Sequence, residues 1–490
     1  MLAASTEMEK ISQGQNPEKM QKEESSYPEM LTRAEVFDYA PSKGCIVLRP
    51  YGMSMWKSVQ NELGNLLQDK AGADDAYFPT LIPQELIEKE KAHIKGFSPE
   101  LMQLSIGQEK TGLVLRPTSE TIIYDLFSNW IKSYRDLPLK INQWCSVYRA
   151  ELRTYPFLRT REFLWQELHA AHNNEKGASD YVQKILNIYS QFIEDHLAVA
   201  TVTGLKTEKE KFPGAKYTTT LEALPNEKAL QVGTSHNLGT GFSEAFGVKF
   251  LDKDNLLKPP ILTSHGVSWR ILGAMFLSHN DERGLILPPK IAPYQVVIIP
   301  SLSGEAEEVM KKTNELNENL VKNGIRVKVD KEQDKTLGFK YNYWDKKGVP
   351  LKITIGDREV KNKIYEVTRR DKNIKDPDQK IKISFDEDIN KIIVETLDEI
   401  QNNLLEKSQK HIQENIRQVD DRQKLEELIK TKGGFNAVFL CDKRECEDEL
   451  KKFKASVRCI PFNDSKEKGE CIFCGKPSSY GKRVLVAKAY

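Results

Sequence analysis

One segment restricts the possible folds of this chain most, because residues 140–172 have the pattern of a single long β-hairpin. Two extended arms, 144–151 and 159–172, flank a proline-containing loop. Since the side chains of a strand alternate between its two faces, each arm should gather a mixed set of aromatic and charged residues on one face. These sets are Arg149 and Glu151 in the first arm, and Arg161, Phe163, Trp165, Glu167 and His169 in the second.

This mixed face has two possible interpretations. A pocket would use it to stack a flat ring on Phe163 and to offer the guanidinium of Arg149 to a phosphate. A half-exposed sheet would use it for cross-strand pairs of arginine and glutamate, and the hairpin taken alone favours that interpretation. The choice depends on the rest of the chain.

Residues 262–279 supply a second constraint, because a strand there runs directly into a helix at Arg270. The apolar face of that helix is formed by Ile271, Leu272, Met275 and Phe276. We expect Gly273 to let the helix approach the sheet closely and the fork of Arg270 to point at the pocket floor. The neighbouring Trp269 is expected to pack in the core.

Composition excludes several classes of protein. The 490 residues should form two to four domains. Lysine plus arginine at 73 against aspartate plus glutamate at 71 gives a net charge of +2, so contact with nucleic acid must be local. No apolar run reaches the ~18–20 residues that cross a bilayer, and no signal peptide is recognisable, which predicts a cytoplasmic protein without membrane contact.

Changes in pattern divide the chain into four parts. We expect a flexible tail at 1–27, a unit with the hairpin at 28–290, a second domain at 291–405 and a C-terminal domain at 406–490. The second domain has the strand–helix–strand order of a parallel α/β sheet. Its expected elements are the strand Tyr294–Pro300, the helix Glu305–Asn323 and the strand Ile325–Val329.

The last fifty residues hold five of the seven cysteines, which suggests a metal in a reducing compartment. Cys441-x4-Cys446 and Cys471-x2-Cys474 are two pairs at spacings common in zinc sites, and Gly475 permits a tight turn after the last of them. Tetrahedral zinc is therefore favoured over free thiols.

Together, the hairpin and Gly266–Arg270 resemble motifs 2 and 3 of the class II aminoacyl-tRNA synthetases, with Tyr148–Glu151 as the aromatic-Arg-x-Glu part of motif 2. Motif 1, a long helix followed by a strand that ends in proline, resembles Met55–Gln68 and Ala76–Pro79, which would place Pro79 at a dimer interface. Further matches point to the prolyl-tRNA synthetases of the archaeal and eukaryotic type. They are Lys43–Cys45, Arg49–Gly52, Arg116–Glu120 and Gln231–His236.

The resemblance implies an α+β catalytic domain with an antiparallel sheet and helices, then an α/β anticodon-binding domain and a small zinc-binding α+β domain. It implies a homodimer that attaches L-proline to tRNA(Pro) through prolyl-adenylate, with Mg²⁺ accompanying ATP and a structural Zn²⁺. The rival interpretations are another class II synthetase of the same subgroup, such as threonyl or seryl, and a catalytically silent paralogue that binds tRNA. Intact Arg149, Glu151 and Arg270 speak against the silent paralogue.

The chemistry of proline can be compared with the residues at 118–120. The secondary ammonium of proline has two N–H donors, so its pocket needs two converging acceptors, and Thr118 and Glu120 could supply both from an extended segment. The same stretch also has the pattern of a helix start.

The resemblance assigns the remaining roles. For proline it implies Thr118, Glu120, Arg149, Trp165, Glu167, His169 and His236. For ATP it implies Arg149, Glu151, Thr160, Phe163, Gln231, Thr234, Ser268 and Arg270. Arg149 and Arg270 would act in catalysis, and the zinc ligands would be Cys441, Cys446, Cys471 and Cys474, with Cys459 left as a buried thiol.

Overall fold

The computed structural model describes residues 26–93, 101–302, 306–462 and 466–490. Residues 1–25 of the expected tail lie outside this part. Tyr27, which we placed in the tail, instead opens helix α2 (Tyr27–Arg33), where its ring stacks on Tyr155 at 5.3 Å between centroids. The folded chain therefore begins slightly earlier than predicted. No helix among the described residues is both long and apolar enough to cross a bilayer.

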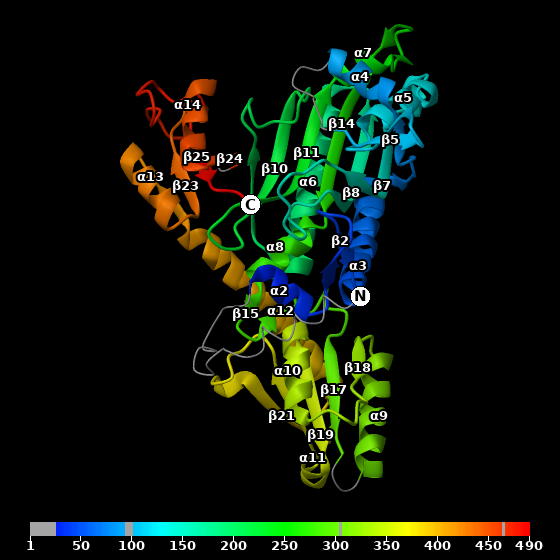
Figure 1. Cartoon of the computed structure of the whole chain (residues 1–490), viewed down its shortest axis with the longest axis vertical. Coiled ribbons are helices and arrows are strands. Elements are labelled where there is room, and N and C mark those ends of the chain that lie inside the picture. Colours follow the sequence, from blue (N-terminus) through cyan, green and yellow to red (C-terminus); the bar gives the residue numbers. More distant parts are fainter. Residues whose placement is uncertain (1–25, 94–100, 303–305, 463–465) are drawn as a thin grey trace, which may run out of the picture.

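An antiparallel sheet forms the centre of the upper part of the molecule (Figure 1). The strands of this sheet are, in order, β9 (Thr201–Leu205), β10 (Tyr217–Ala223), β11 (Leu230–Gly239), β14 (Ile261–Ser268), β8 (Glu162–His172) and β7 (Leu139–Tyr148). The short β3 (Asp74–Asp75) pairs in parallel with β7. The predicted hairpin is confirmed, because β7 and β8 pair along their lengths with Val147 opposite Phe163.

Three helices cover one face of this sheet, namely α3 (Pro50–Leu66), α6 (Glu175–Leu197) and α8 (Arg270–Ser278). Leu168 and Ala170 of β8 belong to the core that these helices share with the sheet. The alternation of β8 thus has a physical cause: its even-numbered residues pack in the core, which leaves the odd-numbered ones for the other face.

The expected form of motif 1 is only partly correct. The helix begins earlier, at Pro50, and continues after Leu66 as a π-helical turn, η2 (Leu67–Ala71). Residues 76–79 do not form the predicted strand, because the amide of Phe78 donates to the side chain of Gln143 (2.5 Å) and Pro79 has no N–H for a ladder.

Smaller elements complete the catalytic domain. A second core around Phe127 and Phe242 joins α5 (Glu120–Trp130) and α7 (Gly241–Phe246). The other elements are the strands β1 (Phe37–Tyr39), β2 (Ile46–Leu48), β4 (Leu81–Pro83), β5 (Gln103–Ile106), β6 (Glu109–Leu115), β12 (Phe250–Leu251), β13 (Leu257–Lys258), β15 (Asn280–Asp281) and β16 (Gly284–Leu285), and the helices α4 (Gln84–His93) and η3 (Tyr134–Asp136).

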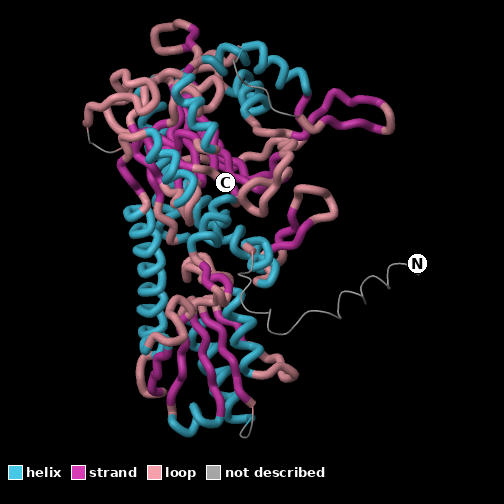
Figure 2. The backbone as a smooth tube through the Cα atoms, turned by 60° about the vertical axis from the view of Figure 1, so that its left-hand side comes forward, coloured by secondary structure: helices cyan, strands magenta, loops and turns pink. Residues whose placement is uncertain are grey.

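The second domain lies below the first as a five-stranded sheet flanked by helices (Figure 2). The strand–helix–strand prediction is confirmed by β17 (Val296–Ser301), α9 (Ala306–Lys322) and β18 (Val327–Val329), with β17 parallel to β18. Glu305 of the expected helix lies outside the described residues. The sheet is mixed, because β20 and β21 are antiparallel. The other elements are α10 (Leu337–Lys347), β19 (Leu351–Gly356), α11 (Asp357–Asn362), β20 (Ile364–Arg369), η4 (Pro377–Gln379) and β21 (Lys380–Ser384).

The boundary predicted between 405 and 406 falls inside a single helix, α12 (Ile389–Glu414), which connects the second domain to the C-terminal one (Figure 1). The elements that follow are β22 (Ile416–Gln418), α13 (Arg422–Thr431), β23 (Phe435–Val438), α14 (Arg444–Asp448), η5 (Glu449–Phe453), β24 (Ser456–Pro461) and β25 (Val484–Ala487). Strand β24 pairs with β9 of the catalytic domain, so the two sheets form one eleven-stranded sheet.

Candidate active site

A cavity of about 330 Å³ lies on the catalytic sheet, lined by the odd-numbered residues of β8. It brings together most of the residues predicted from the sequence. Those lining it are Thr118, Glu120, Arg149, Phe163, Trp165, Glu167, His169, Gln231, Thr234, His236, Ser268 and Arg270. Two arginines from distant parts of the chain therefore line one cavity, as the pocket interpretation requires.

Three polar neighbours hold Glu167 at the floor of the cavity. One carboxylate oxygen accepts from Ser119 (2.5 Å) and from the side-chain amide of Gln143 (2.8 Å), and the other lies 3.0 Å from Nε2 of His169. Burial acts to raise the pKa of Glu167, but these hydrogen bonds outweigh it and lower the pKa. Glu167 is therefore ionised. The opposite ring nitrogen of His169 lies 3.0 Å from the hydroxyl of Tyr124, which fixes the ring that contacts Glu167.

Thr118 and Glu120 are buried side by side, and the hydroxyl of Thr118 donates to the carboxylate of Glu120. The expected extended segment ends before Glu120, because helix α5 begins at that residue. The alternative pattern of a helix start is therefore confirmed. Helix α5 thus places the carboxylate of Glu120 at the cavity, with the hydroxyl of Thr118 next to it.

Arg149 follows the last residue of β7, where its backbone amide donates to the carbonyl of Arg161 (2.8 Å). Its Nε donates to the carbonyl of Pro117 (3.2 Å), and its guanidinium lies over the rings of Phe163 and Trp165, 5.1 and 5.8 Å from their centroids. Burial lowers its pKa, partly offset by the nearby glutamates.

Arg270 is the first residue of α8 and is held by main-chain carbonyls. Its Nε donates to Leu158 (2.9 Å) and its Nη1 to Gln231 (3.4 Å). Burial, together with the charges of Arg149 and Arg159, lowers the pKa of Arg270 to about 10. Within the described ranges neither Arg149 nor Arg270 forms an ion pair with a carboxylate, so both remain available to an anionic ligand.

The residues around Arg270 pack against the loop between β7 and β8. A Cβ added at Gly273 would lie 2.5 Å from the side chain of Leu158, so this glycine accommodates that loop, and the expectation that it serves the sheet is wrong. Trp269 is 4% exposed and lies 5.6 Å from the ring of Phe157, which confirms that it packs in the core.

Two predicted ATP residues do not line the cavity. Beyond Tyr148 the strand ends in a tight turn, in which the amide of Glu151 bonds to the carbonyl of Arg149 (2.7 Å), so Glu151 does not share a face with Arg149 as predicted. Its carboxylate lies 3.5 Å from Arg159. Thr160 is 3% exposed, and its hydroxyl has no hydrogen-bond partner in the described part of the chain. Their contact with ATP stays a prediction.

Comparison with known proteins agrees with this geometry. Three family models match in order: the tRNA synthetase class II core domain (G, H, P, S and T) at residues 103–280, an anticodon binding domain at 295–395, and the prolyl-tRNA synthetase C-terminal domain at 422–490. The proline–tRNA ligases of Natranaerobius thermophilus and Alkaliphilus oremlandii are 39% and 42% identical, each with 95% of both chains covered. The chain belongs to the prolyl-tRNA synthetases. This membership confirms the family resemblance and the three-part fold.

A solved prolyl-tRNA synthetase agrees over the same extent. The structure from Cryptosporidium parvum, complexed with halofuginone and AMPPNP, superposes with a TM-score of 0.88 at 38% identity, covering 95% of this chain and 97% of that one. A second structure from that organism, complexed with L-proline and AMP, gives a TM-score of 0.87 at 36% identity. As a member of the prolyl-tRNA synthetases, the chain is a proline–tRNA ligase and not a threonyl or seryl enzyme.

The sequence analysis missed one wall of the synthetase cavity, the loop at residues 206–213. It contributes Lys206, Glu210, Lys211, Phe212 and Pro213. The ring of Phe212 lies 4.9 Å from that of His236, whose Nδ1 is 2.8 Å from the hydroxyl of Thr218. Burial, with the charges of His169 and Lys206, lowers the pKa of His236 to about 3, so its ring is neutral near pH 7. This loop carries no signal in the sequence, because most of its residues are charged and such a stretch is typical of a solvated surface.

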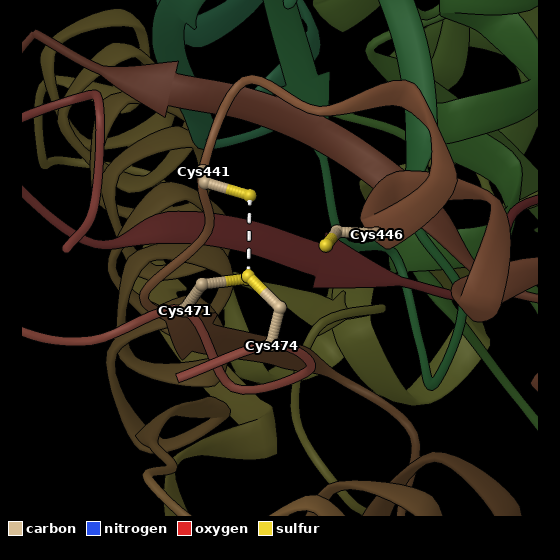
Figure 3. A group of neighbouring side chains, drawn as sticks. All are labelled: Cys441, Cys446, Cys471 and Cys474. Atoms are coloured by element: carbon tan, nitrogen blue, oxygen red, sulfur yellow. Dashed lines mark hydrogen bonds between the residues drawn. The ribbon is translucent and has the colours of Figure 1, made fainter. Parts of the chain in front are cut away.

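The four cysteines predicted as zinc ligands gather in the C-terminal domain of the synthetase (Figure 3). Their sulfurs lie within 4.8 Å of one another, and those of Cys441 and Cys474 are 3.7 Å apart. Zn–S bonds of ~2.3 Å in a tetrahedron place sulfurs about 3.8 Å apart, so the cluster is compatible with zinc. Gly475 has a φ of +68°, as the expected turn requires, and Cys459 is fully buried in another cluster.

Proposed function

We propose that this cavity joins L-proline to ATP and then passes the prolyl group to the 3′-terminal adenosine of tRNA(Pro). One observation supports this most. Arg149 and Arg270, neither paired with a carboxylate in the described structure, line the same small cavity as Thr118 and Glu120. An anion of phosphate size and a small ammonium group can therefore bind next to each other.

Proline would bind where two acceptors converge. The hydroxyl oxygen of Thr118 and the carboxylate of Glu120 would accept the two N–H groups of the secondary ammonium. The pyrrolidine ring would contact Trp165, Phe212 and the neutral ring of His236, which leave no added charge against its methylene groups. The rings of Trp165 and Phe212 would favour the methylene groups of proline over the hydroxyl of threonine or serine.

ATP would bind along the other side of the cavity. We assign its α-phosphate to Arg149 and its γ-phosphate to Arg270, with adenine on Phe163 and with Gln231, Thr234 and Ser268 next to the ribose and phosphates. Mg²⁺ would accompany the nucleotide as part of the substrate, because oxygen atoms of phosphate and water are the ligands it prefers. The oxygen-bearing side chains on this side are compatible with a partly hydrated ion.

The reaction needs no nucleophile from the protein. The carboxylate of proline is already ionised at pH 7, and one of its oxygens attacks the α-phosphorus while the bond to pyrophosphate breaks. The residues would act by holding the two reactants in line and by neutralising the charge that develops on the phosphates. Arg149 contributes to both effects, because it lies between the carbonyl of Pro117 and the ring of Phe163.

Exchange of pyrophosphate into ATP, measured with each of the twenty amino acids, tests this assignment. We expect proline to support exchange at least ~100-fold better than threonine or serine, because the aromatic walls fit a closed ring of methylene groups and Thr118 and Glu120 match its two N–H donors. Exchange driven best by threonine or serine would contradict the proline site. Absence of exchange with every amino acid would refute the proposed reaction in this cavity.

We also propose that the synthetase acts as a homodimer through the region of Pro79. Tyr77 is 73% exposed and Leu81 is 42% exposed, so an apolar surface borders this proline on both sides. The N-terminal part of the catalytic domain, to which these residues belong, is then the expected contact between the two copies.

We propose that the cysteine cluster holds a structural zinc ion through Cys441, Cys446, Cys471 and Cys474. Four thiolate ligands would fill the tetrahedron and leave no position for chemistry. Metal analysis of the purified protein should find about one zinc per chain, and Cys446→Ser should remove it and lower the melting temperature by at least ~5 °C. Cys45→Ser, which changes a cysteine outside the cluster, is the matched control and should keep the metal. Purified protein without zinc would refute the site.

A further inference from the structure

Three charged side chains are buried where the C-terminal domain joins the catalytic sheet. Glu222 of β10 is fully buried, and the side chains of Lys206 and Arg458 are 4% and 10% exposed. Nζ of Lys206 donates to Oε1 of Glu222 (2.8 Å), and Nε and Nη2 of Arg458 donate to Oε2 (2.9 and 2.8 Å). The same Nζ also donates to the backbone carbonyl of Arg458 (2.8 Å), so the three residues are mutually linked.

This cluster belongs to the seam between two domains. Arg458 lies on β24, which pairs with β9 two residues later, at Ile460 and Leu205. The backbones meet closely there, because a Cβ added at Gly204 would lie 2.4 Å from the carbonyl oxygen of Ile460. Lys206 is the first residue after β9, so the C-terminal domain holds the chain where the cavity loop 206–213 begins.

A second contact joins the same loop to the same domain. The hydroxyl of Thr207 donates to Oε1 of Glu447 (2.9 Å), and Nζ of Lys209 lies 3.0 Å from a carboxylate oxygen of Asp448. Both acids belong to helix α14 of the C-terminal domain. The first residues of the loop are therefore tied to two separate elements of that domain.

The loop in turn forms the wall of the cavity next to the proline side. Phe212 lies against His236, and its backbone amide donates to the hydroxyl of Thr218 (2.9 Å). Arg270 on the ATP side is held by carbonyls of Leu158 and Gln231, which lie outside this loop. Glu222 is opposite Gln231, but the backbone ladder between β10 and β11 fixes both strands there. A shift at the start of the loop should therefore move the wall for proline more than the contacts for ATP.

From these contacts we infer that the C-terminal domain positions the proline-binding wall of the active site, with Arg458 acting through Glu222 and Lys206 as a positioning residue. Arg458 does not line the cavity. Its two hydrogen bonds to Oε2 neutralise Glu222, and Oε1 of Glu222 in turn fixes Lys206 at the start of the loop. This inference rests on the proposed function, since it names the side of the cavity that binds proline.

Arg458→Met tests it in the ATP–pyrophosphate exchange assay. We expect KM for proline to rise ~10-fold while KM for ATP stays within ~2-fold of the wild type, because the loop wall should move while the carbonyls of Leu158 and Gln231 continue to hold Arg270. Arg458→Lys, which keeps the charge, should restore part of the affinity for proline. Arg422→Met is the matched control, because that arginine of the same domain forms an exposed ion pair with Glu449 and should leave both constants unchanged.

Two further variants separate positioning from simple loss of folded protein. Thr207→Val removes only the contact with Glu447 and should raise KM for proline by ~3-fold. Arg458→Met combined with Glu222→Gln should cost no more than Arg458→Met alone, since both residues act as one unit. An unchanged KM for proline in Arg458→Met and Thr207→Val, a lower kcat with both KM values unchanged, or losses that multiply in the double variant would overturn the inference. Wild-type protein without proline-dependent exchange would instead refute the proposed function.

Discussion

Arg149→Ala is expected to reduce proline-dependent ATP–pyrophosphate exchange by ~10³-fold or more, while the protein remains folded. In our assignment Arg149 lies between the two substrates, because its Nε donates to the carbonyl of Pro117, next to Thr118, and its guanidinium lies over Phe163. Removing it leaves the carboxylate of proline and the α-phosphate facing each other without a neutralising charge. Loss of this residue should weaken binding of proline as well as of ATP.

Controls separate this effect from unfolding. The melting temperature and circular dichroism should stay close to those of the wild type, because no carboxylate lies within ion-pair distance of Arg149 in the described structure and buried Glu167 keeps its hydrogen bonds to Ser119 and Gln143. Arg135→Ala, at an exposed arginine before β7, should keep full exchange activity. Arg149→Lys should restore only part of the rate, since a single ammonium cannot reproduce the planar fork. Near-normal exchange by Arg149→Ala would refute the assignment of the cavity.

Part of this site could be predicted from the sequence because its elements are local and periodic. The odd-numbered residues of β8 line the cavity because its even-numbered residues, such as Leu168, pack under the helices. That separation is visible in the sequence as alternation. The helix after Arg270 and the spacing of the cysteines were recognisable for the same reason, since each is encoded within a few consecutive residues.

The rest depends on contacts that no local pattern contains. Lys206 is bonded to Arg458, which lies 252 positions later in the chain, and only the pairing of β9 with β24 brings them together. Glu151 was misplaced because alternation was extended past Tyr148, where the chain turns. The predicted division at 405 lies within α12, because the charged residues there continue that helix from one domain to the next.

Arg270→Ala should also lower exchange by ~10²-fold or more, but through ATP alone. Arg270 is fixed by the carbonyls of Leu158 and Gln231, on the side of the cavity away from Thr118 and Glu120 in our assignment. Its guanidinium would meet the γ-phosphate, so KM for ATP should rise. Proline binding, measured by calorimetry without ATP, should stay within ~2-fold of the wild type.

The comparison of the two arginines is more informative than either variant. Arg149 should be needed for both substrates and Arg270 for one, because only Arg149 lies next to the Pro117–Glu120 segment. Arg270→Lys should recover part of the affinity for ATP, since it keeps a charge at the start of α8. If Arg270→Ala instead lost affinity for proline as strongly as Arg149→Ala, the two arginines could not hold opposite ends of the triphosphate, and the nucleotide would have to lie differently in the cavity.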